Sequence, residues 1–435
     1  MKSKIINGCK YWGQLFLLPV YWLSFLFPRD QKLWLFGSTF GRRFADNPRY
    51  LYLYVSQHSD RASDRVKQQM AKWQAAGHAY AEDENCKDIR AVWITHKKEI
   101  AAFLTEEGYE AYYYHSLKGI YLALRAGIYI YDNYSKDINF WQSGGAVKFN
   151  LWHGSGNKKT NYDNKFDFVR HPRNNWERFR YFLRRLSDEK PYHYTLATGP
   201  MMADIFTSAF RTDLSHIVQA GYPRNDALFS DCEISNVLTK EEKKVVSDMK
   251  WQKQAGYHLL VYMPTFRDSE ELFFDVMNLA QFDAYLKKQG YVFYTKLHPK
   301  SKLCKKFEQI KAERIINISA EVDPYTFLSL CDNLVTDYSS IYSDYLMLNR
   351  PSVLFPFDFS EYTKDTRECY FTYEEYMPEI RAVTMQELMD DIVQVNEEDH
   401  CEEGRLALRD RIFKTSDSTA CRTIVEVVRT KLLKG

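Results

Sequence analysis

The chain has 435 residues, of which 45% are hydrophobic and 27% are charged. This length is too great for one ordinary core and predicts two domains, and the composition excludes an intrinsically disordered chain. The 59 Lys and Arg residues nearly balance the 57 Asp and Glu residues, which leaves a net charge of +2. Because nucleic-acid binders usually carry a basic excess, we expect no nucleic-acid partner.

Residues 11–27 form an almost wholly apolar and aromatic run. The run is shorter than the about 20 residues that a membrane-spanning helix needs, and Pro19 lies within it. Trp12 and Trp22 favour the lipid headgroup region. We therefore expect residues 1–30 to be an interfacial, membrane-associating segment; the alternative is a helix buried against the protein.

From residue 31 to residue 235, short apolar runs alternate with helical patterns. Strands are predicted at 33–36, 91–95, 111–114, 128–131 and 147–152, with a helix near 97–107. The polar stretch 57–90 is predicted to be irregular. Such alternation is typical of a parallel sheet covered by helices.

Residues 236–435 show a second alternation, which begins after a charged helical stretch near 238–250. Strands are predicted at 258–262, 291–295, 314–318, 333–336 and 352–355, and helices near 383–398 and 418–434. We therefore predict an α/β protein of two Rossmann-like domains, 31–235 and 236–435, with a cleft between them, the arrangement called GT-B.

In open parallel sheets, functional side chains follow the carboxyl ends of the strands. Four polar clusters hold that place here, at 151–159, 263–268, 296–299 and 336–340. A His beside Gly or Pro is often only a turn residue, and a Ser at a helix start is often only a cap. Four clusters at the ends of strands nevertheless predict a common site.

The last cluster lies in a strand–turn–helix–strand pattern at 331–355, with the helix predicted at about 341–348. The turn opens onto a helix N-terminus, where free backbone N–H groups attract anions. Ser339 and Ser340 add two hydroxyl groups at this point. The pattern therefore predicts a binding site for a phosphate group.

Five motifs stand in order between roughly residues 30 and 400. They are Leu151-Trp152-His153-Gly154 with Lys158, Gly221-Tyr222-Pro223-Arg224-Asn225-Asp226, Pro264-Thr265-Phe266-Arg267-Asp268, Leu297-His298-Pro299, and the block from Thr336 to Pro351 with Tyr362 beyond it. In these motifs the sequence resembles the CDP-glycerol:poly(glycerophosphate) glycerophosphotransferases of teichoic acid and capsule synthesis. It departs from the family's usual Thr-Pro at Ser155-Gly156 and from its usual Arg-Gly-Phe at Arg367-Glu368-Cys369, which leaves the acceptor and the polyol open.

The resemblance implies an enzyme of the EC 2.7.8 class. It would transfer a polyol phosphate from a CDP-polyol to a hydroxyl of a lipid-linked or polymeric glycan acceptor, with release of CMP. His153 is then the candidate general base, and His298 is expected to contact the pyrophosphate. The other site residues divide into a donor set, Arg267, Asp268, Thr336, Asp337, Ser339 and Ser340, and an acceptor-side pair, Lys158 and Arg224.

The donor expected from the resemblance is CDP-glycerol, with CDP-ribitol as the alternative. A GT-B glycosyltransferase that uses a nucleotide sugar and a non-catalytic, membrane-bound scaffold are the competing interpretations. The eight Cys form no C-x-x-C pair, and we expect neither a metal nor a cofactor. Because CDP-linked donors are made in the cytoplasm, we expect a peripheral protein on the cytoplasmic face of the cell membrane.

Overall fold

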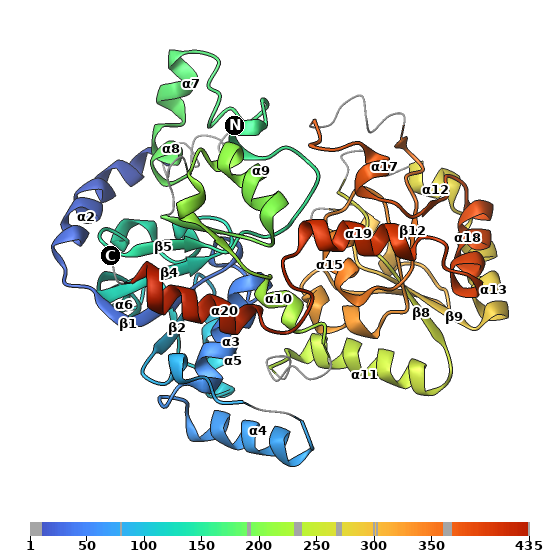
Figure 1. Ribbon diagram of the computed structural model, residues 1–435, viewed down its shortest axis with the longest axis horizontal. Coiled ribbons are helices and arrows are strands. Elements are labelled where there is room, and N and C mark those ends of the chain that lie inside the picture. The colour runs from blue at the N-terminus through green and yellow to red at the C-terminus, as the bar shows by residue number, and fades with distance from the viewer. Residues whose placement is uncertain are drawn as a thin grey trace. The chain divides into compact units, whose positions relative to one another are not determined.

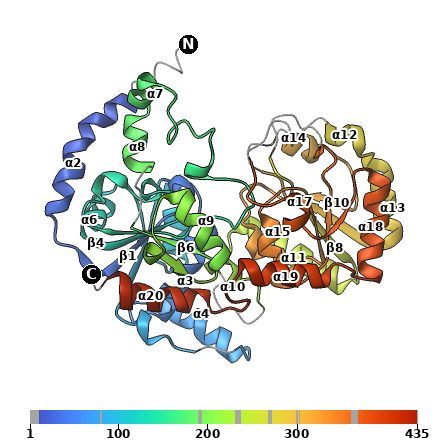
Figure 2. The same cartoon turned by 45° about the horizontal axis from the view of Figure 1, so that its top comes forward.

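The computed structural model describes residues 11–78, 81–188, 193–229, 237–266, 272–298, 301, 303–359 and 368–433. The chain folds into two compact units, each with its own parallel sheet (Figure 1 and Figure 2). Unit 1 comprises Met1–His153, Thr160–Asn236 and Asp417–Gly435, and unit 2 comprises Gly154–Lys159 and Val237–Ser416. The predicted α/β fold with parallel sheets is confirmed.

The sheet of unit 1 has the strand order β3-β2-β1-β4-β5-β6-β7, and all of its pairs are parallel. The strands are β1 (Asp30–Phe36), β2 (Arg90–Thr95), β3 (Ala111–Tyr113), β4 (Ala126–Tyr131), β5 (Val147–Asn150), β6 (Tyr194–Ala197) and β7 (Ile217–Gln219). Every residue of β4 is buried, as in a strand covered on both faces. The strand order reverses direction between β1 and β4, so a ligand site is expected beyond their carboxyl ends.

The helices of unit 1 fall mostly between these strands in the chain. They are α2 (Leu18–Leu23), α3 (Asp46–His58), α4 (Asp64–Ala75), α5 (Lys98–Glu106), α6 (Leu117–Arg125), α7 (Asn175–Arg180), α8 (Phe182–Asp188), α9 (Pro200–Phe210), α10 (Pro223–Asp226) and α20 (Ala420–Val427). Helix α3 packs against β2, α10 and α20 and is buried along most of its length, including Tyr50, Leu51 and Leu53.

The stretch 57–90 is not irregular as predicted, because it contains helix α4. Ser63 caps this helix, its Oγ accepting a hydrogen bond of 3.2 Å from the N–H of Val66. Val66 and Met70, one turn apart, are the buried residues of α4. One narrow apolar stripe thus contacts the protein, in a helix whose remaining side chains are mostly polar.

The N-terminal run forms three short helical pieces, the 3-10 turn Gln14–Leu17, α2 and the 3-10 turn Ser24–Leu26. No residue of α2 is buried, and Phe16, Trp22 and Leu26 are 85%, 64% and 78% exposed. The segment nevertheless contacts unit 1, since Tyr21 stacks on Phe140 with ring centres 4.7 Å apart and Ser24 is buried. It is thus packed against the protein on one side without being enclosed by it. No helix in the described part of the chain has both the length and the apolar character needed to cross a membrane.

Unit 2 contains a sheet with the strand order β10-β9-β8-β11-β12-β13, again with parallel pairs throughout. The strands are β8 (His258–Tyr262), β9 (Tyr291–Thr295), β10 (Ile315–Asn317), β11 (Asn333–Thr336), β12 (Ser352–Leu354) and β13 (Ile380–Arg381). The helices are α11 (Lys240–Gln254), α12 (Leu272–Val276), α13 (Leu279–Gln289), α14 (Leu303–Glu308), α15 (Ile341–Tyr345), α17 (Tyr373–Tyr376), α18 (Met385–Glu397) and α19 (Glu402–Ile412). The order reverses between β8 and β11, the counterparts of β1 and β4.

Residues 417–435 belong to unit 1, although the sequence placed them in the second domain. The N-terminus of α20 explains this difference. The carboxylate of Asp226 accepts hydrogen bonds from the N–H groups of Ala420 and Cys421, at 3.1 and 2.8 Å. A carboxylate at a helix N-terminus satisfies donors that have no partner within the helix, so Asp226 fixes α20 to unit 1.

Candidate active site

The loops after β1 and β4 of unit 1 are joined through a buried carboxylate. Asp132, directly after β4, accepts hydrogen bonds from Ser38 Oγ at 2.6 Å and from the N–H of Thr39 at 3.0 Å. Asp137 accepts from the N–H groups of Phe40 and Asn133, both at 2.9 Å. Burial raises the pKa of Asp132, and burial together with the nearby charge of Asp132 raises the pKa of Asp137 well above its ordinary value. These carboxyl groups hold the ends of β1 and β4 together.

His153 lies in the loop after β5 and is exposed, although both of its sequence neighbours are buried. Its Nδ1 is 3.0 Å from the backbone oxygen of Asp132. A carbonyl oxygen can only accept, so Nδ1 carries the hydrogen in the neutral ring and Nε2 keeps the lone pair. Trp152 has a φ of 55°, a left-handed conformation that a bulky residue adopts only when its surroundings impose it.

Two buried polar side chains impose this loop conformation. Asn47 donates from Nδ2 to the oxygen of Trp152 at 2.9 Å. Arg224, which is 2% exposed, donates from Nη1 to the oxygen of His153 at 3.0 Å and to Asp46 Oδ1 at 2.7 Å. The guanidinium of Arg224 therefore holds the backbone of His153. The acceptor contact expected for Arg224 from the sequence stays a prediction.

Unit 2 joins the loops after β8 and β11 in a similar way. Asp337 Oδ1 accepts a hydrogen bond of 2.8 Å from the N–H of Thr265, and Thr336 Oγ1 donates to the oxygen of Met263 at 2.8 Å. Thr336 and Asp337 are both fully buried. They connect the two loops to each other, and the donor contact that the resemblance implies for them stays a prediction.

Ser339 and Ser340 precede α15, which has five residues and continues as the 3-10 turn Leu346–Leu348. The side chain of Ser340 caps no backbone N–H of α15. Within the described part of the chain, neither of the two hydroxyl groups forms a hydrogen bond. The serines are therefore not simple helix caps, and their hydroxyl groups remain able to bind a ligand.

The segment Gly154–Lys159 belongs to unit 2, where it pairs with residues 368–371. The N–H of Lys159 donates to the oxygen of Glu368 at 2.8 Å, and Lys158 forms an antiparallel bridge with Cys369. Asn157 donates from Nδ2 to the oxygen of Phe371 at 2.9 Å and accepts from the N–H of Phe371 at 2.8 Å. The segment directly after His153 is in this way built into unit 2.

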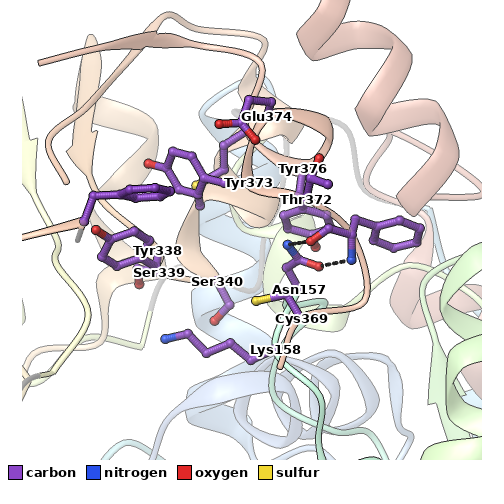
Figure 3. Close-up of a pocket in the computed structure, with 13 residues that line it drawn as sticks. Asn157, Lys158, Tyr338, Ser339, Ser340, Cys369, Thr372, Tyr373, Glu374 and Tyr376 are labelled. Carbon is purple, nitrogen blue, oxygen red and sulfur yellow. Dashed lines mark hydrogen bonds between the residues drawn. The ribbon is translucent and has the colours of Figure 1, made fainter. Parts of the chain in front are cut away.

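Lys158, Ser339 and Ser340 meet in a cavity of about 260 Å³ within unit 2 (Figure 3). Its lining consists of Asn157, Lys158, Tyr338, Ser339, Ser340, Phe359, Cys369, Phe371, Thr372, Tyr373, Glu374, Tyr376 and Met377. Figure 3 shows Lys158 and Ser340 at one end of the cavity and Glu374 at the other. Three rings form an aromatic cluster, with centroids 6.2 Å apart for Tyr338 and Phe359, 5.5 Å for Tyr338 and Tyr373, and 5.4 Å for Phe359 and Tyr373.

The cavity combines an apolar wall with one cation and several hydroxyl groups. Flat aromatic surfaces suit a planar base, and an ammonium with hydroxyl donors suits phosphate oxygens. The sequence pointed to Ser339 and Ser340, but it gave no role to Asn157 or to the aromatic wall. The signal available in the sequence was the aromatic run Tyr370-Phe371-Thr372-Tyr373.

His298 does not line this cavity. Its ring centre lies 5.2 Å from that of Phe266, and with Pro264, Thr265 and Ser301 it lines a smaller cavity of about 20 Å³. The side chain is exposed. Arg267 and Asp268, the other expected donor residues of this loop, lie outside the described residues. Of the expected donor set, the larger cavity brings together Ser339 and Ser340 and adds Lys158 to them.

Known proteins resemble this chain over most of its length. The family model for CDP-Glycerol:Poly(glycerophosphate) glycerophosphotransferase matches residues 63–430. The teichoic acid poly(glycerol phosphate) polymerase of Bacillus subtilis (strain 168) is 24% identical over 411 residues, which cover 92% of this chain and 48% of that protein. The teichoic acid glycerol-phosphate transferase of Staphylococcus aureus (strain NCTC 8325 / PS 47) is 23% identical over 416 residues, which cover 92% and 93%.

The fold is similar to a solved structure of the wall teichoic acid polymerase TagF, with a TM-score of 0.69 and 20% sequence identity. That match covers 99% of this chain and 97% of the other. This chain therefore spans about half the length of the Bacillus subtilis relative and nearly all of the Staphylococcus aureus one.

Proposed function

This chain belongs to the CDP-glycerol:poly(glycerophosphate) glycerophosphotransferase family, and we propose that it transfers glycerol phosphate from CDP-glycerol to a hydroxyl of a lipid-linked or polymeric cell-envelope glycan. CMP is the other product. The observation that carries the proposal is the cavity of unit 2, where an aromatic wall, two serine hydroxyls and a lysine meet. The names of the relatives, which include a teichoic acid glycerol-phosphate transferase, support the same reaction.

In this proposal the donor lies in the cavity of unit 2. The cytosine ring packs against the wall that contains Tyr338 and Tyr373, and the pyrophosphate meets Ser339, Ser340 and Lys158. His298 lines a separate, smaller cavity of unit 2, and its expected hydrogen bond or positive charge at the phosphate that leaves with CMP stays a prediction from the resemblance. The two units form a GT-B pair, with unit 1 as the acceptor-binding domain and unit 2 as the donor-binding domain.

The acceptor hydroxyl attacks the phosphorus atom that bears the glycerol. A new bond forms between the acceptor oxygen and phosphorus, and the bond from phosphorus to the bridging oxygen of CMP breaks. The bridging oxygen keeps the electron pair, and the proton of the acceptor hydroxyl passes to Nε2 of His153. The hydrogen bond from His153 Nδ1 to the oxygen of Asp132 holds the ring in the tautomer that can take this proton.

Membrane attachment forms part of the same proposal, because a lipid-linked acceptor lies at the bilayer surface. The N-terminal segment 11–27 presents Phe16, Trp22 and Leu26 to solvent. Trp12 stacks on Phe179 of α7 with ring centres 4.8 Å apart, so the segment packs against unit 1 at this point. We place the protein at the cytoplasmic face of the cell membrane, with this segment in the interface.

Product analysis tests the proposed reaction. The purified protein is incubated with CDP-glycerol, CDP-ribitol or UDP-linked sugars, each with a glycerol-phosphate-primed acceptor, and the released nucleotide is measured. We expect acceptor-dependent CMP release from CDP-glycerol. If CMP were released from CDP-ribitol alone, the donor would be CDP-ribitol. If UDP were released, the protein would be a glycosyltransferase and the proposal would be wrong.

A further inference from the structure

One wall of the donor cavity consists of two chain segments that are far apart in sequence and lie outside the sheet of unit 2. Gly154–Lys159 runs antiparallel to residues 368–371. Ser343 Oγ donates to the oxygen of Ser155 at 2.8 Å, and Gly154 and Gly156 approach Ser340 so closely that an added Cβ would lie 3.3 Å from its side chain. This segment therefore lies directly against Ser340, one of the two serines of the cavity.

Asn157 makes more of the bonds between the two segments than its neighbours do. Its backbone oxygen accepts from the N–H of Tyr370 at 2.8 Å, and its side-chain amide both donates to and accepts from the backbone of Phe371. An amide side chain that bonds both backbone groups of one residue acts as an additional strand partner. The dashed lines in Figure 3 show these two bonds.

The next two residues differ in their surroundings. Lys158 lines the cavity at the end where Ser340 lies. Lys159 forms an ion pair of 2.9 Å with Glu368 and is not among the residues that line the cavity. Lys158 is the only Lys or Arg among the lining residues that the structure describes. Its place is fixed by the backbone pairing of Asn157 on one side and of Lys159 on the other.

We infer that Asn157 is a positioning residue for the donor, which acts by holding Lys158 where its ammonium meets the donor pyrophosphate. This inference rests on the proposed function. When the amide is removed, the backbone around Lys158 gains freedom, and binding the donor must order it again. The contribution of Lys158 to donor affinity is then lost, although its charge is still present.

A double-mutant cycle on donor affinity tests the inference. CDP-glycerol is titrated calorimetrically into the full-length wild type, Asn157→Ala, Lys158→Ala and the double variant. We expect each single substitution to weaken binding by about tenfold, and the double variant to bind about as weakly as Lys158→Ala. Effects that multiply in the double variant, or an unchanged affinity of Asn157→Ala, would overturn the inference.

The salt dependence of the dissociation constant is a second measurement, which separates the loss of the ammonium contact from general damage to the fold. The interaction of an ammonium with a pyrophosphate weakens as salt rises, so Asn157→Ala and Lys158→Ala should both reduce the salt dependence of the dissociation constant. Lys159→Ala is the matched control and should leave both the affinity and its salt dependence close to wild type. A salt dependence of Asn157→Ala equal to that of wild type contradicts the inference.

Asn157→Gln keeps the amide on a side chain longer by one methylene, and we expect it to bind with intermediate affinity. If Asn157→Ala does not fold, as judged by circular dichroism, the Gln variant takes its place in the cycle with the same criteria. Failure of the proposed function has a different outcome, since the wild type itself would then not bind CDP-glycerol.

Discussion

Nδ1 of His153 lies 3.0 Å from the backbone oxygen of Asp132, the first residue after β4. This contact joins the loop after β5 to the loop after β4, where the buried Asp132 carboxylate in turn binds the loop after β1. Hydrogen bonds among the loops after β5, β4 and β1 thus fix the position of the exposed imidazole. Nε2 is left as the proton acceptor, and the ring is oriented without an acidic partner on Nδ1.

Replacing the candidate base should lower turnover while leaving donor binding intact. We expect His153→Ala to reduce the turnover number with saturating CDP-glycerol by about 100-fold or more, as for the loss of a general base. His298→Ala should cause a similar loss, because the charge that develops on the phosphate leaving with CMP would no longer be stabilised. Initial rates of CMP release provide the measurement, and the exposed His216 and His400 supply control variants. Near wild-type turnover in either variant would remove its assigned role.

The two serine hydroxyls of the cavity should contribute to donor affinity. A neutral hydrogen bond is worth about 0.5–1.5 kcal/mol, so the double substitution Ser339→Ala and Ser340→Ala should raise the dissociation constant of CDP-glycerol about tenfold or more. Ser319→Ala, an exposed serine beyond β10, should have no effect. Calorimetric titration distinguishes the two results. An unchanged affinity of the double variant would show that the hydroxyls do not contact the donor.

Lys148 of β5 should destabilise unit 1 at neutral pH. It is 8% exposed, and burial, with the nearby charge of Arg29, lowers its pKa from 10.5 to about 8. Its ammonium lies 5.8 Å from the ring centre of Tyr21, and no ion pair is found for it among the described residues. Because the unfolded chain binds more protons between pH 8 and 10.5, stability should rise with pH across this window.

Lys148→Met removes the buried charge and should stabilise the protein at pH 7 by up to about 3 kcal/mol, since each pKa unit corresponds to about 1.4 kcal/mol. It should also abolish the rise in stability between pH 8 and 10.5. Thermal unfolding at several pH values measures both effects. Lys72→Met, on the exposed side of α4, should change neither. A destabilised Lys148→Met would mean that the ammonium has a favourable role.

Deletion of residues 1–28 should release the protein from membranes. The segment exposes large apolar side chains, and their loss removes the interfacial attachment proposed above. Transfer to a soluble acceptor analogue should persist, while transfer to a membrane-embedded acceptor should fall. Cell fractionation measures the attachment, with Phe16→Ser combined with Leu26→Ser as a variant that keeps the chain length. Full-length protein without a membrane-bound pool would contradict the proposal.

Several buried strands were predicted closely from the sequence, because each is a continuous apolar run between polar turns. β8, β9 and β11 have the predicted limits. β7 and β13, with three and two residues, are too short for a periodic signal. β6 has four residues, as many as β11, and was still missed. Helix α4 was missed because only Val66 and Met70 face the protein. The signal of its cap residue, Ser63, was present but was outweighed by the polar composition.

In the candidate site, too, the sequence revealed only what a local pattern can show. Ser339 and Ser340 stand at the end of an obvious strand, so local pattern was enough to find them. Asn157 and Phe371 are 214 residues apart. A hydrogen bond between residues so far apart in the chain cannot be predicted from the local sequence around either of them. The contact of Arg224 with the backbone of His153 was not foreseen for a related reason, since its partners His153 and Asp46 lie far from it in the chain.

The return of α20 to unit 1 has a consequence for how the protein is made. Ribosomes deliver a chain from its N-terminus, and domains commonly fold as they emerge. The sheet of unit 1 is complete by Gln219, but the helix that Asp226 caps and that packs on α3 and α10 is translated after all of unit 2. The surfaces of α3 and α10 therefore stay uncovered until residues 417–433 have been made. We expect chaperone contact during synthesis at these surfaces of unit 1.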